Sequence, residues 1–339
     1  MNRTSANFAP GSPIRRSRTA IETMKSVSAS LVLLLLSGFL AKAASPLAME
    51  IDPARAELAI RFQDRTLLVY VYATNQFKPY VRALYTLLGE NVLRDAPRDH
   101  LHHHGLMYAI SVSGTNFWEE QIAPGTEKPI KLLAHKTGKN ANGLPQAQFT
   151  QLIHWLAPTN KMAADSAAAA LLLEHRTLTL TVDEKNEEVA LRWQSAFQVG
   201  KNAGNVTLHG SAYQGLGLRL PQSFDHVAKF QNAADLPYTN SNSQNVVPAQ
   251  WTTVAGVIDG RDIMLALFGD PRLPPADAAF FSMLDRFAYL SATQSLDKKP
   301  LEYSGGDKFT LDYLVAVYSA HKPRDFVQQR YDRWKQRSQ

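Results

Sequence analysis

The 339-residue chain contains no cysteine, which excludes disulfide bridges, zinc–cysteine sites and thiol nucleophiles. Charged residues are few, at 19% of the sequence, whereas 45% of the residues are hydrophobic. This composition is ordinary for a globular protein that buries a sizeable core. The chain also lacks a Gly-x-Ser-x-Gly motif and a Walker loop. The sequence therefore indicates neither a nucleophile elbow nor a phosphate-binding loop.

A continuous apolar run of about 20 residues, which a transmembrane helix needs, is also absent. The most apolar stretch, within 31–40, follows Met24 and Lys25 and precedes Ala41-Lys42-Ala43. This order is typical of a secretory signal peptide. We therefore expect residues 1–43 to be a signal peptide region cleaved near Ala43, with an uncleaved anchor as the alternative and Met24 as a candidate start. The mature protein would then be periplasmic or secreted, without a membrane span.

The excess of positive charge belongs to the same segment. The full chain has a formal net charge of +6, and residues 1–43 hold six basic residues and one acidic residue. The remaining chain carries 30 basic and 29 acidic residues, a net charge of +1. The mature protein therefore offers no electrostatic case for a nucleic-acid partner.

Strand-like segments dominate the rest of the sequence. Residues 56–72 predict two strands around a turn at Gln63-Asp64, and Asp259-Gly260 between two apolar runs predicts a hairpin. Many further short segments alternate and are bounded by Gly, Pro, Asn or Asp. We expect an all-β fold, a large two-sheet antiparallel β-sandwich in a single domain over residues 50–320. A galactose-mutarotase-like architecture is one candidate.

Only the tail, residues 322–337, has the pattern of a helix. Phe326, Tyr331 and Trp334 are spaced to share part of one face, with charged residues elsewhere. We therefore expect a C-terminal helix that packs on the sandwich through these three side chains.

The segment "DAPRDHLHHHGLMYAISVSG", residues 95–114, holds four of the ten histidines: His100, His102, His103 and His104. If Asp99–His104 is extended, His100, His102 and His104 share one face, and Gly105 permits a bend that lets them converge. These three could then hold a divalent metal ion, with a carboxylate completing the set. The alternatives are an acid–base or ligand site without metal, or histidines that only hydrogen-bond strand ends.

Residues 78–118 resemble the bacterial PmoA-like family, a domain of unknown function. The matching residues are Lys78, Pro79, Tyr80, Gly89, Asp99, His100, His102, His103, Gly105, Gly114, Phe117 and Trp118, followed later by Glu174, Arg176 and Thr177. Leu101 and His104 stand where the family pattern has Pro and Arg. Of the four histidines, His104 therefore has the weakest support from the resemblance as a site residue. The methane oxygenase activity in the family label is not expected, because the mature chain lacks the apolar runs of such a membrane subunit.

Five further residues are candidates for the site, four of them for binding a substrate and Glu174 as a carboxylate. Glu174 and Arg176 share a strand face, as either a buried ion pair or a carboxylate and a substrate clamp. Tyr213 and Arg219 flank glycines that allow close approach of a ligand. Trp118 could stack on a sugar ring or belong to the core.

These observations lead to two hypotheses. The first is an exported, PmoA-like, carbohydrate-active enzyme, an epimerase, lyase or hydrolase. It would use His100, His102 and His103 for acid–base or metal-assisted chemistry, with Glu174 as carboxylate partner and Arg176, Arg219, Trp118 and Tyr213 binding the substrate. The second is a non-catalytic carbohydrate-binding or envelope module. In either case we expect His100, His102 and His103 to line one concave site, with Glu174 or Arg176 close by.

Overall fold

The computed structural model describes residues 46–158, 166–238, 245–273 and 277–338. The signal peptide region expected at 1–43 lies outside these residues. Ala44–Gln339 group into one compact unit. Within the described ranges, no helix combines the length and apolar character needed to cross a membrane.

In the described residues, nine strands form the first sheet, in the order β1-β2-β3-β4-β5-β13-β19-β18-β15. They are β1 (Leu47–Asp52), β2 (Glu57–Phe62), β3 (Arg65–Val71), β4 (Tyr80–Leu84), β5 (Leu106–Ala109), β13 (Gly215–Arg219), β19 (Tyr289–Thr293), β18 (Ala279–Met283) and β15 (Asn245–Pro248). Neighbouring strands are antiparallel. Strand β13, from the middle of the chain, joins the N-terminal strands to the C-terminal ones.

The second sheet has eight strands in the order β14-β16-β17-β21-β11-β10-β9-β8. They are β14 (Lys229–Asn232), β16 (Trp251–Ile258), β17 (Arg261–Phe268), β21 (Lys308–Tyr318), β11 (Glu188–Val199), β10 (Leu172–Asp183), β9 (Pro145–Leu156) and β8 (Thr126–Lys139). This sheet is antiparallel as well.

Smaller elements complete the described chain. A four-stranded sheet has the order β20 (Leu301–Tyr303), β12 (Val206–His209), β6 (Ser111–Val112) and β7 (Thr115–Asn116). Three 3₁₀ turns, η2 (Ala167–Ala169), η3 (Glu184–Asn186) and η4 (Gln222–Phe224), and one α-helix, α1 (Arg324–Ser338), are present.

The local sequence explains the hairpins. In β2, Leu58, Ile60 and Phe62 alternate with less buried residues, so one face of the strand points into the core. Gln63 then takes a positive φ of 53° at the predicted turn. Asp259 and Gly260 have φ values of 49° and 79°, as a two-residue hairpin turn requires. Both predicted hairpins are confirmed by the antiparallel pairing around these turns.

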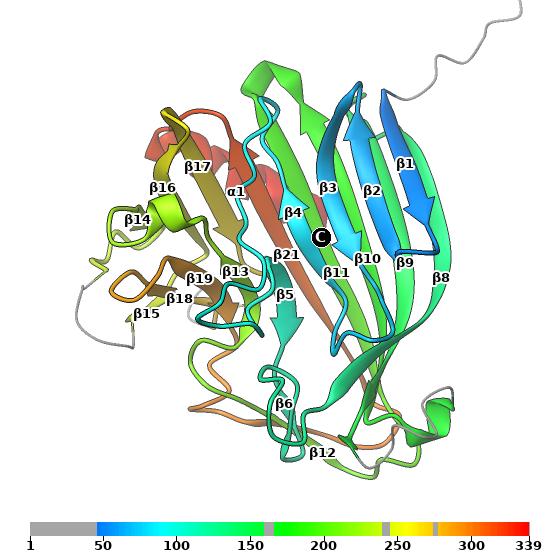
Figure 1. The fold of residues 1–339 in the computed structure, drawn as a ribbon. Coiled ribbons are helices and arrows are strands. Elements are labelled where there is room, and N and C mark those ends of the chain that lie inside the picture. Colours follow the sequence, from blue (N-terminus) through cyan, green and yellow to red (C-terminus); the bar gives the residue numbers. More distant parts are fainter. Residues whose placement is uncertain (1–45, 159–165, 239–244, 274–276, 339) are drawn as a thin grey trace, which may run out of the picture. The chain divides into compact units, whose positions relative to one another are not determined.

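The two large sheets pack face to face over one hydrophobic core that contains buried residues of both. Figure 1 shows the blue strands β1–β3 in front of the green strands β9 and β10. Tyr70 of β3 crosses this interface: its ring centroid lies 5.0 Å from that of Phe149, and its hydroxyl donates to Gln151 Oε1 at 2.6 Å. The predicted antiparallel β-sandwich is therefore confirmed.

Helix α1 covers part of the outer face of the eight-stranded sheet. Val327, Tyr331 and Trp334 form a second apolar cluster with outward-facing residues of the sheet, among them Leu314 and Phe268. Phe326 packs only partly buried against the same cluster. The predicted C-terminal helix is confirmed, and Val327 joins the aromatic residues expected to anchor it.

Candidate functional site

The histidine segment is a loop of two turns rather than an extended strand. The His100 N–H donates to the Pro97 carbonyl at 2.9 Å, and the His103 N–H donates to the His100 carbonyl at 3.0 Å. The extended geometry expected for Asp99–His104 is therefore wrong. In a turn, side chains three positions apart lie near one another, so alternation no longer decides which rings meet.

The turns gather three of the four imidazoles. The His100 and His103 rings stack with centroids 4.6 Å apart, His102 lies edge-on to His103 at 4.5 Å, and His100 and His102 are 5.8 Å apart. Gly105 directly precedes β5, and a Cβ on this residue would lie 2.6 Å from the Val81 carbonyl oxygen. The close contact of the loop with β4 therefore requires glycine at this position.

These three rings line a cavity of about 730 Å³, within the range of small-molecule sites. The remaining lining residues are Trp118, Glu119, Ser211, Ala212, Tyr213, Phe281, Met283, Asp285, Arg286, Phe287 and Tyr289. Five of the predicted site residues, His100, His102, His103, Trp118 and Tyr213, thus come together. They arrive from three separate parts of the chain.

The cavity environment sets the charge of two histidines. Burial, helped by repulsion from His102, His100 and Arg219, lowers the pKa of His103 to about 2. Burial likewise lowers the pKa of His102, with Glu119 acting in the opposite direction. Both rings are therefore neutral at physiological pH, so each has one N–H donor and one acceptor nitrogen.

His100 differs because a carboxylate holds it. Its Nδ1 lies 3.0 Å from Asp99 Oδ2, and Arg219 Nη2 donates to the same oxygen at 3.2 Å. Although burial favours the protonated acid, the hydrogen bond from His100 and the charge of Arg219 hold the pKa of Asp99 below its usual value. An ionised carboxylate on Nδ1 fixes the orientation of the His100 ring and leaves Nε2 for a ligand.

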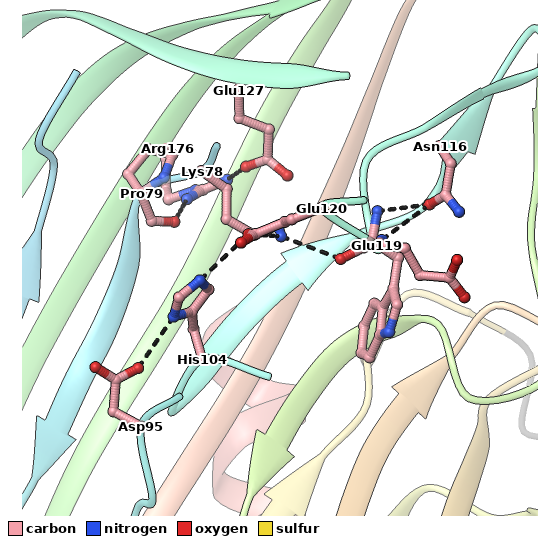
Figure 2. A network of polar contacts seen from close by, with 10 residues as sticks. Lys78, Pro79, Asp95, His104, Asn116, Glu119, Glu120, Glu127 and Arg176 are labelled. Carbon is pink, nitrogen blue, oxygen red and sulfur yellow. Dashed lines mark hydrogen bonds and ion pairs between the residues drawn. The ribbon is translucent and has the colours of Figure 1, made fainter. Parts of the chain in front are cut away.

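His104 points away from the other three rings. Figure 2 shows it between Asp95 and Glu120, whose carboxylate oxygens lie 3.0 Å and 3.2 Å from its two ring nitrogens. Burial opposes its protonation, but these two hydrogen bonds raise the pKa of His104 above its usual value. The ring also stacks on Tyr80 at 4.0 Å.

The proposed metal set of His100, His102 and His104 is therefore wrong for this fold. Both ring nitrogens of His104 are used by carboxylates, so neither has a lone pair available beside His100 and His102. In the described ranges, no three His, Asp or Glu side chains are arranged to hold a metal ion.

The same network supports the cavity wall. The buried Lys78 Nζ donates to Glu120 Oε1 at 2.5 Å and to the Trp118 carbonyl oxygen at 3.1 Å. From the other side, Asn116 Oδ1 accepts hydrogen bonds from the backbone N–H groups of Trp118 and Glu119 at 2.8 Å and 3.1 Å (Figure 2). Lys78 and His104 thus hold the segment that presents Trp118 and Glu119 to the cavity.

Glu174 and Arg176 do not reach the cavity, and the expectation of a carboxylate partner or substrate clamp there is wrong. They share a strand face as predicted, but this face is turned into the core, where both side chains are 0% exposed. Arg176 pairs with Glu174 at 2.8 Å and with Glu127 at 2.9 Å, and also donates to the Pro79 carbonyl at 2.7 Å.

The surroundings of the buried Glu174–Arg176 pair affect the protonation of the neighbouring Glu127. Glu174 accepts further hydrogen bonds from the Trp155 indole at 2.8 Å and from the Ser195 hydroxyl at 2.6 Å. Burial raises the pKa of Glu127 to about 8 despite the nearby Arg176. Glu127 is then mostly protonated at pH 7, which reduces the negative charge beside Arg176.

Arg219 lies behind the cavity wall. Its guanidinium carbon is 3.5 Å from the ring centroid of Phe287, which lines the cavity, and the side chain is 1% exposed. Burial lowers the pKa of Arg219 to about 10, so it remains charged at neutral pH. The expectation that Arg219 contacts substrate is not met; it holds Asp99 and supports the wall.

Gly217 makes room for two aromatic rings. A Cβ at this position would overlap the Tyr289 hydroxyl oxygen and lie 2.9 Å from the Trp118 ring. The Tyr289 hydroxyl in turn donates to the Tyr213 carbonyl at 2.9 Å. The glycines of β13 were expected to allow a ligand to approach; at Gly217 the side chains of Trp118 and Tyr289 fill that space instead.

Several cavity residues were not anticipated from the sequence. Glu119 follows Trp118 directly, and Asp285, Arg286 and Phe287 lie in the connection between β18 and β19. A charged pair followed by an aromatic residue between two strand-like runs is a weak indication, because most such turns are simply solvated. Only the pairing of β19 with β13 brings this turn to the histidine loop.

Unpartnered polar atoms collect around the cavity. Eight buried side-chain atoms lack a hydrogen-bond partner among the described residues, and four belong to His103, Trp118 and Arg219. Leaving a buried polar group unpaired typically costs about 1–3 kcal/mol. A concentration of such groups at one place is more typical of a functional site than of a packed core.

A model of a family of unknown function, DUF6807, matches residues 57–332. The chain therefore belongs to this family. The resemblance to the PmoA-like family, drawn from the histidine segment and from Glu174, Arg176 and Thr177, is wrong, because the family that matches is DUF6807. No curated protein matches the chain.

Solved structures with a similar fold include the GH36 alpha-galactosidase AgaB from Geobacillus stearothermophilus, with 11% identity and a TM-score of 0.45. The alignment covers 80% of this chain and 41% of that one. Another is a galactose mutarotase related enzyme from Lactobacillus acidophilus, with 10% identity, a TM-score of 0.43 and coverage of 82% and 99%. The chain thus spans less than half of the galactosidase. These identities and TM-scores carry no information about the reaction of this chain.

Proposed function

We propose that this member of the DUF6807 family is a carbohydrate-active enzyme that uses its histidine cavity for acid–base chemistry. The observation that carries the proposal is the gathering of His100, His102 and His103 in an aromatic-walled cavity of about 730 Å³. Non-catalytic carbohydrate binding in the same cavity is the second candidate.

The lining supports a sugar as ligand. Trp118, Tyr213, Phe281, Phe287 and Tyr289 supply apolar ring surfaces, on which the C–H face of a sugar ring can pack. Neutral imidazoles each offer one donor and one acceptor, which suits hydroxyl groups. Aromatic walls with a few convergent polar groups are the usual composition of a small-molecule site.

His100 is the residue best suited to transfer a proton. Its Nδ1 is held by Asp99, which is itself held by Arg219. A carboxylate in this position stabilises the imidazolium that forms when Nε2 accepts a proton, and it keeps the ring oriented. Proton transfer of this kind serves epimerisation, elimination and hydrolysis alike.

His103 is suited to a different role. With a pKa lowered to about 2 it is a poor base, and its Nδ1 has no partner among the described residues. We assign it to hydrogen bonding with the ligand and to packing against His100. Exposed Glu119 and Asp285 at the same cavity supply carboxylates in place of Glu174.

The test uses residues 44–339 and a panel of neutral monosaccharides, disaccharides and uronates. Thermal shift identifies ligands, and proton NMR in deuterated water follows turnover. We expect at least one sugar to bind and to be converted, and His100→Asn to lower the rate at least 100-fold, in line with loss of a general acid–base group. His135→Asn, at an exposed histidine of β8, is the control. Equal rates for parent and His100→Asn would contradict the proposal.

The same variants distinguish the enzyme from the second candidate, a non-catalytic carbohydrate-binding module. A binding module would bind a sugar without converting it, and Trp118→Ala would then weaken binding more than His100→Asn. Conversion of the bound sugar favours the enzyme.

We also propose that the protein is exported, on the signal-peptide pattern of residues 1–43 alone. Fractionation followed by N-terminal sequencing would test this. We expect a start near Ala44 outside the cytoplasm, and a soluble cytoplasmic protein that retains Met24 would contradict it.

A further inference from the structure

A second cavity of about 760 Å³ lies on the outer face of the eight-stranded sheet, beside α1. Its floor comes from β9, β10 and β11, and its sides come from the turn after β8 and from the helix. It shares no lining residue with the histidine cavity. It is therefore a separate place on the molecule, to which the proposed function assigns no role.

The floor is a block of uncharged polar side chains. In β9 and β10 alternate residues such as Phe149 and Leu180 point into the core, so Gln146, Gln148, Thr179 and Thr181 point outward. The strand register pairs Gln148 with Thr179 and Gln146 with Thr181. An amide and a hydroxyl therefore lie opposite each other in two neighbouring cross-strand pairs. In the first pair, Gln148 donates a hydrogen bond to Thr179 at 2.9 Å.

The charges around this floor balance. Arg330 pairs with Glu188 at 2.9 Å, and Arg192 pairs with Asp312 at 2.5 Å. Asp183 and Arg333 also line the groove and have opposite signs. Asp312 is not itself a lining residue, but when its pair with Arg192 is counted, three arginines face three carboxyl groups, so charge alone selects neither an anion nor a cation.

The same sheet face has a different character one strand away. Lys131 and Lys136 of β8 are exposed and lie opposite Leu152 and Gln148 on this face, as is usual for a solvated face. The change from lysines to amides and hydroxyls coincides with the groove beside α1. Solvation alone does not explain this change, whereas binding of an uncharged, hydrogen-bonding ligand does.

We propose that this groove binds a neutral polysaccharide chain. Each carboxamide both donates and accepts hydrogen bonds, and each hydroxyl does the same, which matches the hydroxyl groups of a sugar. Phe326 and Trp334 of α1 add apolar surface along one side. The lining crosses three neighbouring strands, from the turn after β8 over β9, β10 and β11 to α1, a width of about 10 Å, so it offers contacts to more than a single sugar ring.

Affinity electrophoresis tests the groove directly. Residues 44–339 are run in gels that contain soluble starch, hydroxyethyl cellulose, xylan or, as an anionic polymer, polygalacturonate. We expect at least one neutral polymer to retard the protein. The double variant Gln146→Ala/Thr181→Ala should weaken that retardation at least fivefold, with the melting temperature checked for each variant.

Two controls make the outcome specific. Thr150→Ala/Thr177→Ala removes the hydroxyls of a neighbouring cross-strand pair on the same face, which does not line the groove. This variant should leave retardation unchanged. His100→Asn should also leave it unchanged, so failure of the proposed enzyme activity does not affect this test. The proposal is overturned if no neutral polymer retards the protein, if both double variants behave alike, or if only polygalacturonate binds.

Discussion

Arg176 and His103 are both buried polar side chains of one sandwich, but they differ in what their nitrogen atoms contact. Arg176 donates to two carboxyl groups and one carbonyl. His103 keeps an Nδ1 without a partner among the described residues. Sequence alone placed both in one site, whereas the structure puts Arg176 inside the core and His103 on a cavity.

The difference separates stability from function. A buried charge that is fully hydrogen-bonded holds its surroundings in place, and removing one partner leaves the others uncompensated. A buried nitrogen without a partner destabilises the fold and has its hydrogen-bonding capacity left for a ligand. The contact pattern around a buried polar group is therefore a better guide to its role than its position in a motif.

The largest loss of stability is expected on replacing Arg176 in the core. Arg176→Met removes the counter-ion of the buried Glu174 and the hydrogen bond to the Pro79 carbonyl, so we expect a loss of about 3–5 kcal/mol in the free energy of unfolding. Urea denaturation measures this loss. Arg82→Met, which breaks a partly exposed pair with Glu57, is the control and should cost at most about 1 kcal/mol. Equal losses for the two variants would contradict the assigned role of Arg176.

The two clusters should also respond to pH with opposite sign. Folded His103 stays neutral down to about pH 2, whereas the unfolded chain protonates it below about 6.5. The unfolded state then binds more protons, so this residue makes stability rise with pH between these values, by at most about 1.4 kcal/mol per pH unit. Subtracting the unfolding curve of His103→Leu from that of the parent isolates the rise.

Glu127 acts in the other direction. Its folded pKa of about 8 lies above the unfolded value, so the folded state binds more protons between about pH 4.5 and 8, and stability falls as pH rises. Glu127→Gln should remove this fall. Parallel pH profiles for the parent and both variants would show that these two groups do not titrate as their surroundings indicate.

A smaller loss of stability is expected at Gly217, which packs against two rings of the histidine cavity wall. Gly217→Ala must displace Tyr289 or Trp118, so we expect a loss of about 1–3 kcal/mol in stability, together with weaker binding of any sugar found in the thermal-shift panel. Gly138→Ala, where an added Cβ meets nothing within 4 Å, is the control. Unchanged binding in Gly217→Ala would mean that the ligand does not use this wall.

The smallest effect is expected within the histidine loop itself. Leu101 is 66% exposed between His100 and His102. Leu101→Ser should change stability by less than about 0.5 kcal/mol and leave sugar binding as in the parent. A marked loss of binding would extend the site beyond the three imidazoles.

The strands and the helix could be predicted because their patterns are local. Alternation in β2 and the Asp259-Gly260 turn each specify a hairpin without help from distant residues. The same alternation correctly put Glu174 and Arg176 on one face. It left open whether this pair is a buried ion pair or part of a site, because alternation does not say which face points inward; the structure shows the buried ion pair.

The histidine cavity was only half predictable. Clustering in the sequence indicated that His100, His102 and His103 act together, but hydrogen bonds to the Pro97 and His100 carbonyls fold the segment into turns. His104 consequently hydrogen-bonds to Asp95 and Glu120 instead of joining the other three rings. Phe287 and its neighbours come from a turn almost 190 positions later, and a single sequence carries no record of that contact.

The position of β13 between β5 and β19 has a consequence for the order in which the protein is made. The histidine loop emerges early in synthesis, but the cavity wall opposite it comes from Phe281 and Tyr289. A growing chain therefore has no binding site until most of its length has left the ribosome. Any ligand that stabilises the folded cavity can act only after β19 has paired, late in folding, because contacts so distant in sequence form slowly.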